Sequence, residues 1–359
     1  MATPRLNINK DISKAHTLSS EFYNQNHFFE LCKETIFKKS WQLITDTKIF
    51  NKYNTYPFYF LEGLLNEPMI FINSGNEKKC FTNVCTHRAH LIVQKSCKIR
   101  RLQCPYHGRR YNLNGTFEYM PGFDGVKNFP SDSDNLNCFP SLEWKSFIFT
   151  SLSPKIRIKG VLDDIDKRLS NFPFHKLILD KNKSATYEID AHWAIYCENY
   201  LEGFHVPFVH SGLNKDINLQ TYETILLENG VLQLAEATKD VEKFQFSTST
   251  TNSGKNIYAL YYWIFPNLML NFYPWGLSVN IIEPLGVNKT RIKFLSYPIK
   301  PKTQPMDNPS SLDKVELEDQ SVVKQVQKGI KSLAYKPGRY SVIHEKGVHH
   351  FHRLIVKYL

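Results

Sequence analysis

Short apolar runs separated by turn signals characterise the chain from residue 40 to about residue 153. The runs at residues 58–61, 69–72 and 147–150 have the length of strands. Turn-forming clusters divide them, for example at residues 73–76 and 114–115. The pattern predicts an antiparallel all-β domain over residues 40–153, with a boundary at residues 151–154.

Residues 17–39 carry aromatic and aliphatic side chains at mixed helical spacing, which predicts a helix. We therefore expect residues 1–39 to form a helical segment that packs on the C-terminal domain.

Residues 154–359 mix long strand-like segments with helical ones. Strands are predicted at residues 226–235, 257–265, 268–272, 277–283 and 290–299, and helices at residues 195–205 and 315–331. Residues 303–311 contain Pro and Asn and are expected to form a loop. The second domain is therefore predicted to be α+β, which makes the whole chain α+β.

Composition excludes several functions. No apolar run approaches the roughly 18 residues of a membrane span, and residues 1–20 lack an apolar signal core. We expect a soluble, cytoplasmic protein with no membrane partner. The net charge of +11 is dispersed, with only short basic pairs such as Arg109–Arg110, so no nucleic-acid partner is expected. The charge indicates a solvated surface or a docking patch for an acidic electron donor.

The seven cysteines are an odd number in a long chain without a signal segment, which argues against a disulfide framework. Two tight Cys/His pairs suggest metal ligation instead: Cys85 and His87 in one, Cys104 and His107 in the other. Two thiolates and two imidazoles are the ligands of a Rieske [2Fe–2S] cluster. A zinc site is the alternative, but zinc motifs usually pair Cys with Cys and His with His. Cys97, between the pairs, is expected to be structural or free.

A second constellation follows at Glu202, His205 and His210. Glu202 and His205 are three residues apart, so a helix would place them on one face. Pro207 is expected to end that helix, which would allow His210 to return beside His205. Two imidazoles and one carboxylate with open positions form the site of non-haem iron oxygenases.

The predicted helix at residues 315–331 supplies the best remote carboxylate, Asp319. It falls on an apolar stripe formed by Val315, Val322, Val326 and Ile330. A carboxylate on a buried face needs a partner, which a metal would provide. The alternatives are an Asp319 that caps the helix or pairs with Lys324, and ligation by Glu316 or Glu318.

The spacing C-x-H-x16-C-x2-H resembles the Rieske family. Positions 90 and 106 hold His and Tyr, where the respiratory branch has a disulfide between the cluster loops. From about Ser40 onward the chain resembles the catalytic α subunits of Rieske non-haem iron oxygenases, of the ring-hydroxylating type. Asn199, Glu202, His205 and His210 resemble that family's iron motif. Residues 318–319, 326–329, 338–341 and 345–348 resemble its C-terminal segments.

The resemblance implies a Rieske domain and a catalytic domain with a curved antiparallel sheet packed by helices, of the helix-grip or START-like type. It implies a Rieske cluster on Cys85, His87, Cys104 and His107, and Fe(II) on His205, His210 and Asp319. It also implies that Glu202 links the cluster of one subunit to the iron of the next, in a homotrimer. Glu instead of Asp at this position resembles the choline/carnitine monooxygenase-like branch.

The expected function is that of a terminal oxygenase component. Electrons from NAD(P)H would arrive through a flavin/iron–sulfur reductase or a ferredoxin, and O2 would be used to hydroxylate a small organic substrate, such as choline, carnitine or a betaine. Hydroxylation or demethylation of an aromatic compound remains an alternative. A Rieske electron carrier with a non-catalytic ligand-binding domain is a more remote one.

Aromatic residues, histidines and arginines outside the two ligand sets also have expected locations or roles. Aromatic residues at 261–265 and 271–275 are expected to be sheet core, a cation–π box or an aromatic-binding surface. The histidines at 349, 350 and 352 are expected at the surface or at a subunit contact. Arg88, Arg109 and Arg110 are expected around the exposed edge of the cluster, where they would dock the electron donor.

Overall fold

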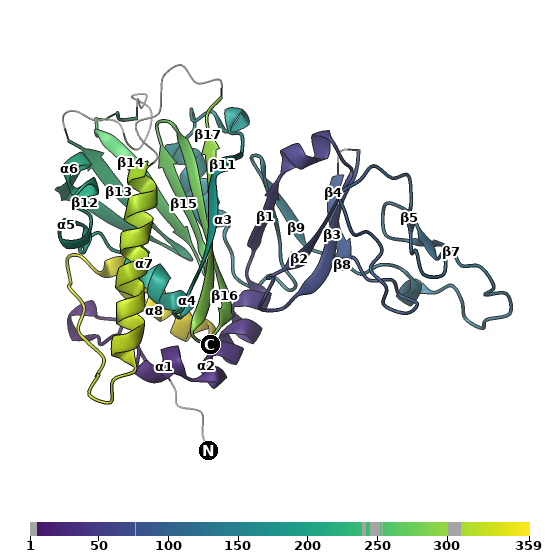
Figure 1. The fold of residues 1–359 in the computed structure, drawn as a ribbon, viewed down its shortest axis with the longest axis horizontal. Coiled ribbons are helices and arrows are strands. Elements are labelled where there is room, and N and C mark those ends of the chain that lie inside the picture. Colours follow the sequence, from purple (N-terminus) through teal and green to yellow (C-terminus); the bar gives the residue numbers. More distant parts are fainter. Residues whose placement is uncertain (1–5, 76, 239–241, 245–251, 253, 301–309) are drawn as a thin grey trace. The chain divides into compact units, whose positions relative to one another are not determined.

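The computed structural model describes residues 6–75, 77–238, 242–244, 252, 254–300 and 310–359. They form two compact units (Figure 1). One is Lys38–Lys155, and the other combines the N-terminal residues up to Phe37 with Ile156–Leu359. The boundaries predicted from the sequence fall after residues 39 and 153. The loop predicted at residues 303–311 lies outside the described residues, except for Ser310 and Ser311, which belong to a helix.

Three small antiparallel sheets build the unit Lys38–Lys155. The first has the order β2-β3-β4-β8, formed by β2 (Thr55–Phe60), β3 (Glu67–Ser74), β4 (Glu77–Thr82) and β8 (Cys138–Phe139). The second has the order β1-β10-β9, formed by β1 (Gln42–Asp46), β10 (Phe147–Thr150) and β9 (Ser141–Trp144). The third consists of β5 (Leu102–Gln103), β6 (Arg110–Tyr111) and β7 (Phe117–Tyr119). The all-β antiparallel prediction is confirmed.

One seven-stranded antiparallel sheet forms the centre of the second unit, in the order β11-β17-β16-β15-β14-β13-β12. Its strands are β11 (Asp180–Ile189), β12 (Ile217–Leu227), β13 (Gly230–Ala237), β14 (Ile257–Ile264), β15 (Leu268–Tyr273), β16 (Gly276–Gly286) and β17 (Lys289–Pro298). The longer helices are α1 (Ser20–Asn24), α2 (Asn26–Thr35), α3 (Lys159–Arg168), α4 (Trp193–Tyr200), α7 (Ser310–Ile330) and α8 (Lys346–Tyr358). Two single-turn helices, α5 (Val206–Val209) and α6 (Leu213–Asp216), follow α4. The 3₁₀ helices are Ile12–Lys14, Phe37–Lys39, Thr47–Asn51, Asp132–Asp134 and Phe174–Lys176.

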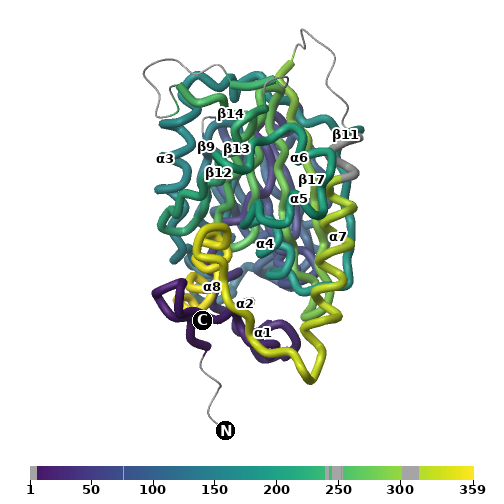
Figure 2. Tube along the Cα trace, turned by 90° about the vertical axis from the view of Figure 1, so that its left-hand side faces the viewer, coloured from purple at the N-terminus to yellow at the C-terminus, as the bar shows by residue number. Residues whose placement is uncertain are grey.

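The two faces of this sheet have different neighbours, because successive strand residues point to opposite sides. On β14, Trp263 packs against Phe351 of α8, with ring centroids 5.1 Å apart. The next residue back, Tyr262, points the other way and donates a hydrogen bond to Asp164 of α3 at 2.7 Å. Helices α4 and α7 contact each other, and α4 also contacts β16; Figures 1 and 2 show α7 passing along the sheet beside α4.

Two predicted elements are wrong because a local turn outweighs the apolar periodicity. The strand predicted at residues 226–235 is a hairpin, since β12 ends at Leu227, β13 begins at Gly230 and these two residues pair. Glu228 and Asn229 form the two-residue turn between the strands. The helix predicted at residues 17–39 is interrupted at Gln25, which is extended at φ −96° and ψ 127°.

The surface role expected for the histidines of α8 is wrong for His349 and His352, which are 5% and 1% exposed. His352 lies between the Tyr340 hydroxyl, 2.6 Å from Nδ1, and a carboxylate oxygen of Glu198, 2.9 Å from Nε2. Tyr23 donates to the same Glu198 oxygen at 2.7 Å. These polar contacts allow the histidine to be buried, and they connect α1, α4 and α8. None of the described helices has the length and apolar character needed to cross a membrane.

A substitution of Gly347, near the start of α8, tests how tightly this helix packs. A Cβ on Gly347 would collide with the carbonyl oxygen of Leu201, the residue before Glu202. We predict that Gly347→Ala lowers the free energy of unfolding by about 1–3 kcal/mol, because α8 must move away from Leu201. Urea denaturation followed by tryptophan fluorescence measures this change.

The matched control is Gly329→Ala on α7, where an added Cβ meets nothing within 4 Å. This variant is expected to gain about 0.5–1 kcal/mol through its higher helix propensity. Equal unfolding midpoints for the two variants would contradict the packing argument.

Candidate functional site

The two Cys/His pairs of the smaller unit lie on loops with the same hydrogen-bond pattern. In the first loop, Cys85 N–H donates to the carbonyl of His90, and Ala89 N–H donates to the carbonyl of Cys85. Cys104, Gly108 and Arg109 repeat this pattern in the second loop. Ala89 and Gly108 occupy equivalent positions, with φ of +56° and +73°. Each loop therefore makes a tight left-handed turn directly after its histidine-bearing segment.

The four side chains of these loops converge in a way that fits a cluster with two thiolates and two imidazoles. Cys85 and Cys104 are buried, and the rings of His87 and His107 have centroids 4.9 Å apart. His87 Nδ1 is buried and has no hydrogen-bond partner. Burial, together with His107, Arg109 and Arg88, lowers the pKa of His87 and favours the neutral ring that binds metal.

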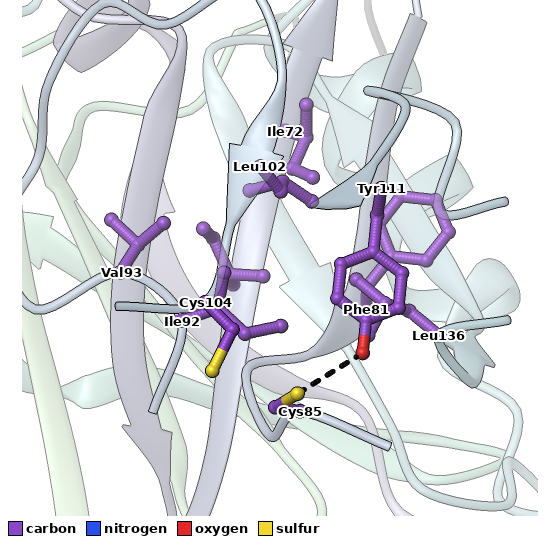
Figure 3. Packing of buried hydrophobic residues seen from close by; sticks show 10 residues of the cluster. Ile72, Phe81, Cys85, Ile92, Val93, Leu102, Cys104, Tyr111 and Leu136 are labelled. Atoms are coloured by element: carbon purple, nitrogen blue, oxygen red, sulfur yellow. Dashed lines mark hydrogen bonds between the residues drawn. The ribbon is translucent and has the colours of Figure 1, made fainter. Parts of the chain in front are cut away.

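Tyr111 connects the cluster loops to the core behind them. Its hydroxyl donates to the Cys85 sulfur at 3.3 Å, and Figure 3 shows this contact beside Cys104. Hydrogen bonds to cluster sulfurs raise the reduction potential. The same core contains Ile70, Ile72, Phe81, Ile92, Val93, Leu102 and Leu136. All seven cysteines, which lie within the described residues, are free, and the rings of His90 and Tyr106 have centroids 6.0 Å apart.

The arginine prediction is wrong for Arg109. This side chain is 2% exposed, and its guanidinium forms an ion pair with Asp134 at 2.6 Å. It also lies over the rings of Phe117 and Phe129, at 4.9 and 5.5 Å. A buried cation needs such partners, so Arg109 packs within the domain. Arg88 is exposed, and Arg110 is partly buried against Tyr119.

The Glu202–His205 pair of the larger unit is formed by a turn and not, as predicted, by a helix face. Helix α4 ends at Tyr200. The Glu202 carboxylate accepts hydrogen bonds from the backbone N–H groups of Phe204 and His205, the latter at 3.0 Å, and also contacts His205 Nδ1 at 2.7 Å. Pro207 lies in the first turn of α5 and does not end a helix, because a first-turn residue needs no N–H partner.

The buried face of helix α7 differs from the predicted apolar stripe. Val326 is 39% exposed, whereas the buried face carries Gln320, Val323, Gln327 and Ile330. Asp319 lies at the edge of this face and contacts two imidazoles. The helix is therefore buried along a partly polar stripe, which the apolar pattern alone does not reveal.

One ligand atom each from His205, His210 and Asp319 lies within 4.8 Å of the others. Asp319 Oδ1 is 3.0 Å from His210 Nε2 and 3.5 Å from His205 Nε2. The two Nε2 atoms are 3.2 Å apart. The structure thus brings together the three residues predicted as metal ligands, from the α4–α5 segment and from α7.

The outer nitrogens of both rings face carboxylates. Glu202 lies 2.7 Å from His205 Nδ1, and Glu318 lies 2.9 Å from His210 Nδ1. If each Nδ1 donates to its carboxylate, both Nε2 atoms direct lone pairs at one point. A metal cation fits that point, and carboxylate–histidine pairs of this kind are typical of metal centres. The donor set fits a mononuclear iron with open positions.

The carboxylates around the two imidazoles also set the charge of the rings. Burial lowers the pKa of His205, but hydrogen bonds with Asp319 and Glu202 outweigh this and hold the pKa at about 9. Partial burial raises the pKa of the Asp319 carboxyl, but contacts with the two histidines outweigh this and hold the pKa below its ordinary value. Without a metal, the carboxylates therefore favour a protonated His205 ring, and a metal cation bound to the same nitrogen would take the place of that proton.

A cavity of about 110 Å³ opens onto the three converging side chains. Its lining includes Asn199 and five tyrosines, Tyr196, Tyr200, Tyr222, Tyr261 and Tyr273. The aromatic strands contribute by alternation: Tyr261, Asn271 and Tyr273 face the cavity, whereas Tyr262 and Phe272 pack together on the other side of the sheet. Of the aromatic residues in these segments, Tyr261 and Tyr273 line the cavity, whereas Tyr262, Trp263, Phe265 and Phe272 belong to the core.

Sequence reasoning missed several cavity residues. Tyr222 and Gln233 come from β12 and β13, where the predicted single strand hid a hairpin. Glu316 entered only as a competing metal ligand, but it lines the cavity and contacts Tyr196 instead. Its position three residues before Asp319 is the signal that places both on one helix face.

Comparison with known proteins agrees with this geometry. The family model for the ring hydroxylating alpha subunit (catalytic domain) matches residues 179–359, and the Rieske [2Fe-2S] domain model matches residues 47–130. The chloroplastic choline monooxygenase of Arabidopsis thaliana is 27% identical over 366 residues, covering 96% of this chain and 83% of that protein. The carnitine monooxygenase oxygenase subunit of Escherichia coli (strain K12) is 28% identical over 363 residues, covering 96% and 94%.

The fold also matches a solved structure of a quaternary ammonium Rieske monooxygenase, with a TM-score of 0.80 and 22% identity over 98% of this chain and all of that one. The predicted family and cofactors are confirmed. The chain belongs to the catalytic α subunits of the ring-hydroxylating oxygenases, which are enzymes that use a Rieske [2Fe–2S] cluster and a mononuclear iron.

Proposed function

We propose that this oxygenase acts on a small quaternary amine. The observation that carries the proposal is the cavity beside His205, His210 and Asp319, because tyrosine rings and carboxylates line it together. Aromatic faces and negative charge are the groups that bind a trimethylammonium cation. The relatives named choline monooxygenase and carnitine monooxygenase support the same substrate class.

In this proposal, His205, His210 and Asp319 hold the iron, which supplies O2 activation when bound. Cys85 and Cys104 hold one iron of the cluster, and His87 and His107 hold the other. The chain itself orients the ligands through Glu202 and Glu318 and binds the substrate in the cavity, with Asn199 in its lining. An electron carrier with a non-catalytic second domain would have no use for the three converging side chains.

A homotrimer, reduced by a separate reductase or ferredoxin, completes the proposal. Glu202 would link the cluster of one subunit to the iron of its neighbour. The segments near Glu202 expose apolar side chains, with Phe208 81% and Ile343 73% exposed, and such side chains are typical of surfaces covered by a partner. The similar quaternary ammonium monooxygenase structure was described in terms of inter-subunit electron transfer.

A substrate screen tests the proposed activity. We predict that the iron-loaded protein, with a surrogate reductase and NADH, oxidises at least one of choline, γ-butyrobetaine, carnitine and glycine betaine. Oxygen uptake and product mass are the measurements. His205→Ala is expected to keep the cluster absorption and lose turnover. Turnover of simple aromatics alone would favour the aromatic alternative, and turnover by His205→Ala would refute the iron assignment.

The Glu318–His210 contact tests the metal site separately. We predict that Glu318→Gln weakens Fe(II) binding by about 10–100-fold, because His210 loses the carboxylate that orients its ring. Anaerobic Fe(II) titration of protein that retains its cluster measures the affinity. Lys324→Gln, a change to an exposed residue of the same helix, should bind iron normally. Equal affinities for the two variants would contradict the role of Glu318.

Glu202 tests the coupling between the two metal centres. We predict that Glu202→Gln slows reoxidation of the reduced cluster by about 10–100-fold in the presence of substrate and O2. Rapid mixing followed at the cluster absorption measures this rate, and Glu202→Asp should restore much of it by replacing the carboxylate. Reoxidation of Glu202→Gln at the wild-type rate, or full activity of a monomer, would exclude the link.

A further inference from the structure

One wall of the cavity carries a partly buried carboxylate that the iron site does not use. Glu316 projects from α7, and its Oε2 accepts a hydrogen bond from the Tyr196 hydroxyl at 2.6 Å. Its Oε1 is 3.5 Å from the Asn280 side-chain nitrogen on β16. Tyr196 and Asn280 are 3% exposed each. Residues of α4 and β16 therefore hold Glu316 in place beside the cavity.

This carboxylate lacks a positive partner among its hydrogen-bonding neighbours. Burial and the charge of Asp319 raise the pKa of Glu316 to about 8. A buried carboxylate is costly without a countercharge, so a cation entering the cavity stabilises its ionised form. A second carboxylate in the same space would have the opposite effect.

Gln233 on β13 is a cavity residue with unused hydrogen-bonding capacity. It is 1% exposed, and its Nε2 donates to the carbonyl of Tyr200 at 2.7 Å. Its Oε1 is buried and has no hydrogen-bond partner. A free amide oxygen accepts hydrogen bonds only, so it complements a hydroxyl group and repels a carboxylate.

The cavity lining contributes Glu202, Glu316 and Asp319 but, among the described residues, neither Lys nor Arg. Recognition of a carboxylate usually requires one of these cations. We propose that Glu316 and Gln233 select a monocation with a hydroxyl group, such as an amino alcohol bearing a quaternary nitrogen, over a zwitterion bearing a carboxylate. This inference rests on the proposed function and narrows its substrate class.

The test compares ligands that differ in one group. Equilibrium dialysis and turnover are measured for choline, its neutral isostere 3,3-dimethyl-1-butanol, ethyltrimethylammonium without the hydroxyl, and the zwitterions glycine betaine and L-carnitine. The wild type is expected to bind choline at least about 10-fold more tightly than each of the others. Equal or tighter binding of the zwitterions would overturn the proposal.

Glu316→Gln is expected to reduce the preference for choline over its neutral isostere by about 10-fold or more, with unchanged iron content. Glu228→Gln, the same substitution at an exposed turn, should leave that preference unchanged. Gln233→Met is expected to reduce the preference for choline over ethyltrimethylammonium by about 10-fold, and it tests the proposal independently if Glu316→Gln does not fold. Unaltered preferences in the folded variants would refute the roles of these residues.

Different results would contradict the proposed function and the proposed selection by Glu316 and Gln233. If no quaternary amine is oxidised, the proposed function is wrong. If quaternary amines are oxidised but zwitterions are preferred, or the variants discriminate as the wild type does, only the selection by Glu316 and Gln233 is wrong.

Discussion

Two imidazole nitrogens and one carboxylate oxygen directed at a single point set the main constraint on the larger unit. His205 Nε2 and His210 Nε2 are 3.2 Å apart, with Asp319 beside both. Because Glu202 and Glu318 face the outer nitrogens, the inner nitrogens are directed at one shared point, which suits a metal cation. This convergence depends on where α4 ends, on the turn at Glu202 and on the position of α7.

The register of α7 is fixed by polar contacts and not only by apolar packing. Gln327 is 2% exposed and accepts a hydrogen bond from the backbone N–H of His192 at 2.7 Å. Its amide nitrogen is 3.1 Å from a side-chain oxygen of Asn288. These contacts join the C-terminal half of α7 to the start of α4 and to the β16–β17 turn. A rotation of α7 would break them, and so they keep Asp319 and Glu316 directed toward the cavity.

Much of this architecture could be predicted from the sequence, because ligand spacing is local information. The Cys/His pairs and the His205–His210 pair were identified from spacing, and the structure places each pair together. The local structure differs from the prediction: a helix is expected at Glu202, but its carboxylate accepts hydrogen bonds from backbone N–H groups in a turn. The hairpin at Asn229 was missed, since apolar residues continue on both sides of it. Gln233 could not be recognised, because its role depends on a neighbouring strand and on an unpaired oxygen.

Different interactions hold the ligands of the two metal sites in place. The cluster loops use paired backbone turns, with Ala89 and Gly108 in left-handed conformations, and a tyrosine hydroxyl on one sulfur. The iron site uses side-chain carboxylates behind each imidazole. The cluster depends on the backbone of one compact unit, whereas the iron site depends on segments distant in sequence. A single substitution at Asp319 should therefore remove one metal centre and leave the other intact.

Metal analysis of the wild type and of Asp319→Asn tests the central claim most directly. With both centres loaded, the account predicts about three irons per chain in the wild type and about two in the variant. The Rieske absorption and electron paramagnetic resonance signals of the two proteins should be identical. An Asp319→Asn variant that retains the third iron, or a wild type that binds only two, would contradict the account.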